Sequence, residues 1–376
     1  MKVWKYHNPV EITFGKGVLS TLSELIGNQK TVLITTPGFT KRGVVHVIKE
    51  MLGPSLLDIY DGVQGYPTFV SIKEAYKVLK CVRYDVILAL GGGSVIDTAK
   101  ALAANSATGS DDWLEHQLKY NVHALEQFSP KPIIAIPTTA GTGTEVTMWA
   151  TVWDMEEKNK YSISHPLLYP KKAVVDPELT LTLPEQDTVY SALDAISHAM
   201  EAIWNKNHNP VSDIYAQKAI EIVYSCLPKV KNDLNNITLR TSLMEASLLA
   251  GLAFSNTKTG IAHAISYPLT AHFGLPHGLA CSLPLPHLLK INGHHAFDRV
   301  KLIADALKVD INAEELSDKI NKLFIDLKVP SHLSYYGISK NDLEVIVNSV
   351  MASVKLNNNI VSLKNDELMM LIESLY

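Results

Sequence analysis

The first half of the chain repeats one order of segments: a short apolar run, a turn and a helical segment. The apolar runs are 31–36, 84–90 and 132–137; helices are expected up to about residue 51 and over 95–104. Strands that alternate with helices indicate parallel β-α units, in which helices cover both faces of the sheet. The sequence therefore predicts an α/β domain with a parallel, Rossmann-like sheet.

The pattern changes after Asp176-Pro177 and Leu183-Pro184. The later segments have the 3.6-residue period of helices, and none is a convincing strand. These segments are 215–227, 240–254, 297–307, 313–327 and 343–354. A chain of 376 residues exceeds one typical core. We therefore predict an α/β domain over 1–183 and an all-α domain over 184–376, with the cleft between them as the default site.

Composition and charge exclude several classes of protein. The chain is 47% hydrophobic and 19% charged, which argues against long disorder, and its net charge of −4 without a basic run argues against nucleic acid as a partner. No segment resembles a signal peptide or a membrane span, so we expect a cytoplasmic protein. Cys81, Cys226 and Cys281 form neither a disulfide framework nor a C-x-x-C site, and they are interpreted as buried or incidental thiols.

Two turns rich in glycine follow predicted strands. Gly91-Gly92-Gly93-Ser94 opens a helix, where backbone N–H groups and the helix dipole favour a phosphate. The spacing is not G-x-G-x-x-G, and this turn alone could equally be a flexible connection. The segment 137–145 adds four hydroxyls and two glycines after another strand. Two such turns at strand ends together predict a nucleotide site.

A carboxylate and several histidines suggest a metal site. Asp194 and His198 are four residues apart, so they share one helix face, although an isolated pair of this kind is more often structural. His263 and His277 follow in a second cluster and add two imidazoles. One carboxylate and three imidazoles suit Fe²⁺, Zn²⁺ or a similar ion, and these ligands do not distinguish between them. Three further histidines are interpreted as structural, namely His287, His294 and His295.

Four segments resemble the signature blocks of the iron-containing (group III) alcohol dehydrogenases, in the family's order. They are GGGSVIDTAK (91–100), PTTAGTGTEVT (137–147), ALDAISHAMEA (192–202) and GIAHAISYPLTAHFGLPHG (260–278). NPVEITFGKG at 8–17 extends the resemblance over essentially the whole chain. The resemblance implies the dehydroquinate synthase-like fold, a catalytic divalent metal, and often a homo-oligomer.

The resemblance also implies roles for particular residues, matched by motif position. The implied metal ligands are Asp194, His198, His263 and His277, with Fe²⁺ expected and Zn²⁺ as the alternative. The implied nucleotide-binding residues are Gly91, Gly92, Gly93, Ser94, Asp97, Thr138, Thr139, Thr142 and Lys160, although Lys160 could equally be a solvated surface lysine. Glu201 is expected to serve structure and not the metal. The implied chemistry is hydride transfer between a nicotinamide and a carbonyl that the metal polarises.

The chain departs from the family pattern at three positions. Tyr267 replaces a relay histidine found in many members, so Tyr267, and secondarily His272, are the predicted proton donors. Thr36 replaces an aspartate that repels a 2′-phosphate, which permits NAD(P)H and favours NADPH. Lys258 replaces glycine or another uncharged residue, and it suits an anionic substrate unless it only faces solvent.

The motifs HAISYPLT…PHG and YHNPV most resemble the family branch of phosphonate metabolism. That branch implies reduction of the small molecule phosphonoacetaldehyde to 2-hydroxyethylphosphonate. One alternative is a general short-chain alcohol dehydrogenase, in which Trp149 and Trp153 line an apolar pocket. Another is a catalytically silent nucleotide- or metal-binding protein, against which the retained ligands and glycine turns argue. Glycerol-type dehydrogenases and sugar-phosphate synthases share the fold, but the spacing of His263 and His277 fits the iron-type block better.

Overall fold

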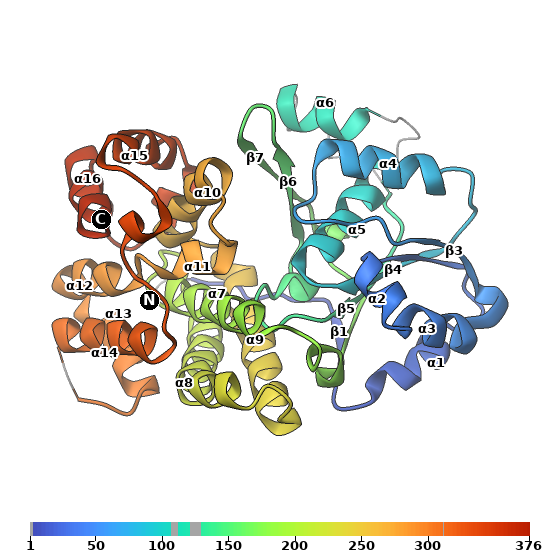
Figure 1. Cartoon of the computed structure of the whole chain (residues 1–376), viewed down its shortest axis with the longest axis horizontal. Helices are drawn as coiled ribbons and strands as arrows, with labels where there is room; N and C mark the ends of the chain where they lie inside the picture. Colours follow the sequence, from blue (N-terminus) through green and yellow to red (C-terminus); the bar gives the residue numbers. More distant parts are fainter. Residues whose placement is uncertain (1–2, 107–111, 121–128, 311) are drawn as a thin grey trace. The chain divides into compact units, whose positions relative to one another are not determined.

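The computed structural model describes residues 3–106, 112–120, 129–310 and 312–376. The chain divides into two units (Figure 1). The sheet unit consists of Asn8–Thr139 and Thr144–Thr180. The helical unit consists of Leu181–Tyr376, the short segment Ala140–Gly143, and the N-terminal segment that ends at His7. Part of the second glycine-containing turn therefore belongs to the helical unit.

The sheet unit is built on six parallel strands in the order β1-β8-β5-β4-β2-β3 (Figure 1). The strands are β1 (Glu11–Phe14), β2 (Thr31–Ile34), β3 (Leu56–Tyr60), β4 (Val86–Gly91), β5 (Ile133–Pro137) and β8 (Lys172–Val175). Every residue of β4 and β5 is buried. Such continuous apolar strands are typical of a parallel sheet that is covered on both faces.

Helices cover the two faces of this sheet. They are α1 (Leu22–Ile26), α2 (Pro37–Lys41), α3 (Val44–Leu52), α4 (Phe69–Leu79), α5 (Gly93–Ser106) and α6 (Trp113–Tyr120). Successive residues of β4 point to opposite faces. Ile87 and Ala89 join the core cluster that includes residues of α4 and α5, whereas Leu88 and Leu90 join the cluster that includes residues of α1 and α3.

Two local features differ from the sequence prediction. The first predicted helix is divided into α2 and α3, because Gly43 has a φ of 80° in the left-handed region. An antiparallel hairpin of β6 (Trp149–Asp154) and β7 (Asn159–Ser164) was not predicted. Its strands mix polar and apolar residues, so they lack the continuous apolar run that marks the buried strands of the parallel sheet.

The helical unit contains the helices after Pro184. They are α7 (Glu185–Ile203), α8 (Pro210–Asn232), α9 (Ile237–Thr257), α10 (Ile261–Phe273), α11 (His277–Ser282), α12 (Leu285–His295), α13 (Phe297–Ala306), α14 (Ala313–Asp326), α15 (Leu343–Met351) and α16 (Asn365–Ser374). Among the residues described after Pro184, β pairing is limited to an isolated bridge between Asn205 and Asn359. The predicted fold class, a parallel α/β domain followed by an all-α domain, is confirmed.

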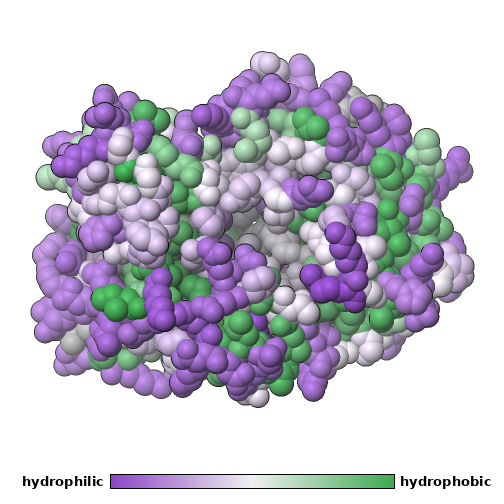
Figure 2. All heavy atoms as spheres, in the orientation of Figure 1, coloured by the Kyte–Doolittle hydropathy of each residue, from purple (hydrophilic) through white to green (hydrophobic). Residues whose placement is uncertain are grey.

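One helix, α9, is long and apolar enough to cross a membrane by length and composition alone. More than half of its most apolar window is buried in the protein, 56%, as expected of a core helix. On the face drawn in Figure 2, apolar residues form small patches separated by hydrophilic ones.

Candidate metal centre and nucleotide-binding turns

Helix α7 places the first two predicted metal ligands inside the helical unit. Asp194 and His198 lie one turn apart, and they are only 3% and 5% exposed. The His198 ring stacks on Phe254 of α9, with ring centroids 4.0 Å apart. Burial lowers the pKa of His198 to about 4, so its imidazole is neutral at pH 7 and offers a lone pair.

The other two predicted ligands come from α10 and α11. His263 lies in the first turn of α10, and His277 is the first residue of α11. Gly278 allows α11 to approach α7, because a Cβ at this position would lie 2.0 Å from the carbonyl oxygen of Tyr190 and 3.0 Å from Asp194 Cβ. The glycine of the Pro-His-Gly turn is therefore required for close helix packing.

The structure brings all four predicted ligands together. His263 Nε2 lies 2.9 Å from His198 Nε2 and 3.5 Å from Asp194 Oδ1. The rings of His263 and His277 lie edge to face, with centroids 5.6 Å apart. Cys281 also belongs to this group: one ligand atom from each of Asp194, His263, His277 and Cys281 lies within 4.8 Å of the others. Because a lone cysteine carries no spacing signal, the sequence did not point to it.

The chemistry of this cluster fits a divalent cation. Asp194 Oδ1 is buried and accepts no hydrogen bond from the part of the chain that the structure describes. Burial alone would raise the pKa of Asp194, but His198, His263 and His277 outweigh it and hold this pKa below its usual range. An ionised, buried carboxylate oxygen that accepts no hydrogen bond is costly unless a cation neutralises it. Asp194 and the surrounding imidazoles would hold that cation.

Glu201, one turn after His198 on α7, orients His263. Its Oε2 lies 2.7 Å from His263 Nδ1, and its two oxygens accept the backbone N–H groups of Gly260 and Ala262 at 2.7 and 2.6 Å. Gly260 has no side chain, and a Cβ there would come within 3.1 Å of Glu201 Oε1. A carboxylate on Nδ1–H leaves the Nε2 lone pair free for a metal. Glu201 therefore acts through His263, as well as fixing the start of α10.

Tyr267 lies beside the metal-ligand cluster. Its ring stacks at 15° to that of His277, with centroids 6.3 Å apart. Burial, with the charges of Cys281, Glu201 and Asp194, raises the pKa of Tyr267 well above 10, so the phenol keeps its proton. The phenol also hydrogen bonds to Thr259. The secondary candidate, His272, is exposed in the last turn of α10 and contacts Phe273.

Lys355 extends this group of polar side chains. Its Nζ donates to Thr259 Oγ1 at 2.6 Å and lies 5.3 Å from the Tyr267 ring centroid. Burial lowers the pKa of Lys355 to about 8, and the positive charge of Lys258 contributes to the lowering. Sequence reasoning missed Lys355 because it lies 92 residues after His263 by number, outside every motif.

Lys258 follows α9 with a strained backbone. Its φ of 68° and ψ of 176° lie in a region that essentially only glycine adopts. The backbone is held there by Lys258 N–H to Phe254 O at 2.8 Å and by Asn205 Nδ2 to Lys258 O at 3.1 Å. The side chain is exposed. The structure therefore holds an exposed lysine at a position that suits glycine.

The two glycine turns meet at the carboxyl edge of the sheet. Gly91 ends β4, Gly93 begins α5, and Thr138 N–H donates to Gly91 O at 3.1 Å. A Cβ on Gly92 would approach the Thr139 side chain to 3.0 Å, so the turns are in contact. Gly93 and Ser94 lie at the positive end of the dipole of a 14-residue helix, which suits a pyrophosphate.

The remaining predicted nucleotide residues have varied surroundings. Both carboxylate oxygens of Asp97 are bound within the sheet unit, by Thr144 Oγ1 at 2.6 Å and Thr151 N–H at 2.8 Å. Lys160 Nζ lies 5.3 Å from the Trp153 ring centroid on the β6–β7 hairpin, which also carries Trp149. Thr36 directly precedes α2. Thr142 belongs to the helical unit.

Lys100, which sequence reasoning did not select, hydrogen bonds to the segment that follows the second glycine-containing turn. This buried lysine on α5 donates from Nζ to the carbonyl oxygens of Thr144, Thr147 and Trp149 at 2.7, 2.8 and 2.9 Å. It also reaches the hydroxyls of both threonines at 3.0 and 3.1 Å. The only sequence signal is a lysine within an otherwise apolar helix face.

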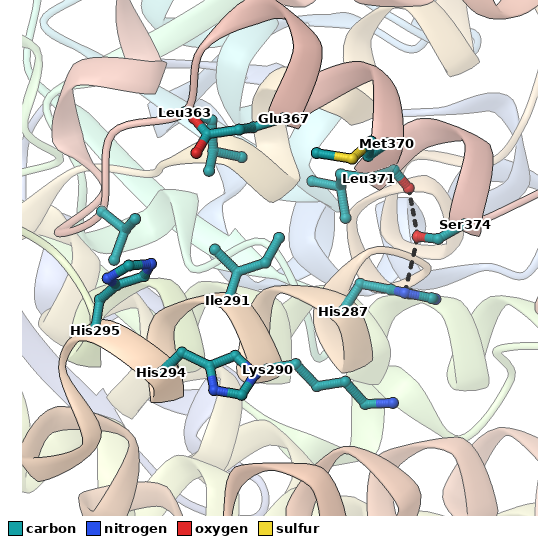
Figure 3. Close-up of a pocket in the computed structure, with 11 residues that line it drawn as sticks. His287, Lys290, Ile291, His294, His295, Leu363, Glu367, Met370, Leu371 and Ser374 are labelled. Atoms are coloured by element: carbon teal, nitrogen blue, oxygen red, sulfur yellow. Dashed lines mark hydrogen bonds between the residues drawn. The ribbon is translucent and has the colours of Figure 1, made fainter.

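A separate pocket of the helical unit lies between α12 and α16 (Figure 3). His287 Nδ1 lies 2.9 Å from Ser374 Oγ, and His294 pairs with Glu314 at 3.2 Å. The residues that line this pocket include none of the predicted metal ligands. These histidines make ordinary surface contacts.

The carboxyl edge of the sheet suits a nucleotide, and the helical unit contains a buried cluster of a carboxylate and imidazoles. Together these features are typical of one class of protein, the metal-dependent oxidoreductases that use a nicotinamide cofactor. Residues 9–177 match the family model "Iron-containing alcohol dehydrogenase", and residues 188–376 match "Fe-containing alcohol dehydrogenase family, C-terminal". The chain belongs to the iron-containing alcohol dehydrogenase family, and it is an NAD(P)-linked alcohol or aldehyde oxidoreductase. The family predicted from the motifs is confirmed.

Three relatives illustrate the range of this family. The chain is 31% identical to the NADPH-dependent butanol dehydrogenase of Clostridium saccharobutylicum, over 98% of this chain and 97% of that protein. It is 30% identical to the sulfoacetaldehyde reductase of Bilophila wadsworthia, over 97% of each. The structure resembles that of sulfoacetaldehyde reductase from Bifidobacterium kashiwanohense in complex with NAD⁺, with a TM-score of 0.92, 29% identity, and coverage of 100% and 99% of the two chains.

Proposed function

We propose that this enzyme reduces a short aldehyde that carries an anionic group, with phosphonoacetaldehyde as the first candidate and 2-hydroxyethylphosphonate as its product. The observation that carries the proposal is Lys258, a cation held in a backbone conformation that suits glycine. Lys258 is close enough to Lys355 for the charges to interact, and Lys355 contacts the Tyr267 ring beside the metal-ligand cluster. Two ammonium groups suit a phosphonate or sulfonate.

The relatives support the same substrate class. Two of them are named sulfoacetaldehyde reductases, and sulfoacetaldehyde resembles phosphonoacetaldehyde as a two-carbon aldehyde with a tetrahedral oxyanion. The butanol dehydrogenase relative favours the second candidate, a general short-chain alcohol dehydrogenase. In that case Trp149 would line an apolar pocket, and Lys258 would only face solvent.

When bound, the metal would supply Lewis-acid polarisation of the carbonyl and the reduced nicotinamide would supply the hydride. Asp194, His198, His263 and His277 would hold the metal, and Glu201 would keep the Nδ1 proton of His263 in place. Tyr267 donates its phenol proton to the substrate oxygen as negative charge develops there. Thr259 connects Tyr267 to Lys355, whose ammonium group can return a proton to the phenol.

We further propose that the glycine turns bind NAD(P)H with a preference for NADPH. Thr36 supplies no charge to repel a 2′-phosphate, and the exposed cations Lys41 and Arg42 follow it closely. Of the relatives, one is named NADPH-dependent and another was solved with NAD⁺. We expect Fe²⁺ or Zn²⁺ in the metal centre, a cytoplasmic location, and a homo-oligomer as the family resemblance implies.

The test compares initial rates of NADH and NADPH oxidation by metal-reconstituted protein handled without oxygen. Phosphonoacetaldehyde and sulfoacetaldehyde are set beside propanal, lactaldehyde and succinic semialdehyde. We expect kcat/KM to favour the phosphonate about a hundredfold over propanal, or roughly 2.7 kcal/mol of transition-state binding. Equal rates with uncharged aldehydes would establish the general alcohol dehydrogenase instead. Binding of nucleotide and metal without any turnover would indicate a silent protein.

A further inference from the structure

The side chain of Arg42 folds back along the short helix α2, which follows β2 in the sheet unit. Its guanidinium carbon lies 4.4 Å from the centroid of the Phe39 ring. Gly38 lies one helical turn before Arg42, and a Cβ on Gly38 would lie 3.2 Å from one terminal guanidinium nitrogen and 3.5 Å from the other. Side chains of a helix point towards its N-terminal end, so the missing side chain of Gly38 leaves room for the guanidinium over the first turn of α2.

The positive charge of Arg42 has no acidic partner among the residues that the structure describes, where its recorded contact is the Phe39 ring. The carboxylate of Asp61, in the loop after β3, instead accepts the hydroxyl of Thr40 at 2.6 Å. Arg42 is exposed. Stacking occupies only the face of a guanidinium, so the N–H donors at its edge stay open to another group. The arginine is therefore held in one place with its donors available to an anion from solution.

The end of β2 connects this arginine to the glycine turn that begins α5. Thr35 follows β2 directly, and its Oγ1 donates to Leu90 O at 2.8 Å. Since β2 pairs in parallel with β4, which ends at Gly91, Thr36 and Gly91 leave adjacent strands side by side. In sheets of this kind a dinucleotide places its pyrophosphate on the glycine turn and its adenosine ribose at the end of a neighbouring strand. Thr36 and α2 therefore lie where the 2′ position of the ribose is expected.

We propose that Arg42 binds the 2′-phosphate of NADPH and that this contact sets the preference for NADPH over NADH. The inference rests on the proposed nucleotide-binding turns and adds the residue that recognises the phosphate itself. Thr36 only removes a repulsion, whereas a guanidinium donates two N–H groups to phosphate oxygens. Because the stack on Phe39 holds the guanidinium before the cofactor binds, little side-chain entropy is lost. The alternative role, shielding the Phe39 ring from water, would not distinguish the two cofactors.

The experiment measures equilibrium binding of NADPH and NADH to metal-reconstituted protein by the fluorescence of the reduced nicotinamide, with no aldehyde present. For Arg42→Met we expect the Kd for NADPH to rise about 10–100-fold and the Kd for NADH to change by less than about twofold, because only NADPH carries the phosphate. The matched control is Arg83→Met. Arg83 is exposed and precedes β4, so it lies at the amino edge of the sheet. This control should leave both Kd values unchanged.

Arg42→Lys keeps the charge and loses the planar pair of donors, so it should recover only part of the NADPH affinity. If Arg42→Met does not fold, an affinity of Arg42→Lys equal to that of wild type still contradicts the proposed geometry.

The remaining outcomes are distinct. An unchanged Kd for NADPH in Arg42→Met, or an equal loss for both cofactors, would overturn the assignment of Arg42 and leave the nucleotide-binding turns intact. Equal affinity of the wild-type protein for NADPH and NADH would overturn it as well. Binding of neither cofactor by the wild-type protein would overturn the nucleotide site together with the role of Arg42. The anionic substrate is tested apart from all of these, by the rate comparison among aldehydes.

Discussion

Glu201 Oε2 and His263 Nδ1 lie 2.7 Å apart, both within the buried core of the helical unit. The carboxylate fixes the proton of His263 on Nδ1 and directs Nε2 towards Asp194 and His198. Carboxylate-histidine pairs of this kind orient metal ligands and raise their basicity. The proposed metal centre would therefore depend on a residue that need not touch the metal.

Glu201→Gln should weaken metal binding about 10–100-fold, because the charge that polarises His263 is lost while a carbonyl oxygen remains. The measurement is competition with a chelator, followed by circular dichroism to show that the variant is folded. Glu157→Gln, on the exposed turn of the sheet unit, is the matched control and should leave the affinity unchanged. An affinity of Glu201→Gln equal to that of wild type would remove Glu201 from the metal centre.

Asp194→Asn should abolish metal retention and lower kcat/KM by about a thousandfold, equivalent to several kcal/mol of transition-state stabilisation. The amide keeps the shape of the side chain and removes the charge that a cation requires. Metal content by elemental analysis and NADPH oxidation rates check both parts. A variant that retains stoichiometric metal would show that Asp194 is not a ligand.

Lys258→Gly and Lys258→Ala form a matched pair that separates strain from function. Glycine relieves a backbone strain of about 1–3 kcal/mol and costs about 0.5–1 kcal/mol of chain entropy, so we expect a net stabilisation of about 1 kcal/mol. Alanine retains the strain, and its stability should stay near that of wild type. Both variants lose the cation, so both should lose the preference for the phosphonate over propanal. Urea unfolding and kcat/KM ratios measure the two effects, and an undiminished preference would count against the substrate proposal.

Lys100→Met should destabilise the protein by about 3 kcal/mol, since it leaves three buried carbonyl oxygens without their common donor. The measurement is urea or thermal unfolding. Lys77→Met, on the exposed side of α4, is the control and should change stability by less than about 0.5 kcal/mol. If Lys100→Met lowers the free energy of unfolding as little as the control does, water replaces the lysine as the donor to these carbonyl oxygens.

The metal-free protein should lose stability between pH 6.5 and 8. Burial disfavours the protonated form of His263, but Cys281, Glu201 and Asp194 outweigh it and raise the pKa of His263 well above 6.5. The folded state then holds a proton that the unfolded state has released, so the free energy of unfolding falls as pH rises above 6.5. His198, with a pKa lowered to about 4, has the opposite effect only below this range, whereas Lys100 and Lys355, with pKa values lowered to about 8, oppose the loss only at its upper end.

Because the metal competes with that proton, Zn²⁺ affinity should rise with pH, by up to about tenfold per unit for one released proton. Urea unfolding of the metal-free protein at pH 6.5 and 8 tests the predicted loss of stability. Zn²⁺ titration in a chelator buffer at the same pH values tests the predicted rise in affinity. Stability that increases over this range, or an affinity independent of pH, would contradict a protonated His263.

Much of the fold follows from local sequence. The strands at 31–34, 86–91 and 133–137 were predictable, because a strand buried on both faces must be apolar throughout. The helices after Pro184 were predictable from their period, and the glycine turns from their position between a strand and a helix. Local sequence gave no comparable signal for the β6–β7 hairpin, whose strands mix polar and apolar residues without a continuous apolar run. Local sequence also predicted a single helix where the structure has α2 and α3, since one glycine with positive φ separates them.

The candidate site shows where local information ends. The spacing of Asp194 and His198 alone places both on one helix face, and the motif resemblance added His263 and His277. Only the tertiary structure showed that Cys281 joins them, that Glu201 orients His263, and that Lys355 reaches Thr259. The physical reason is that helix and strand formation depend on neighbours within a few residues, whereas these contacts depend on how closely separate helices pack. That packing is decided by small features such as the missing side chain of Gly278.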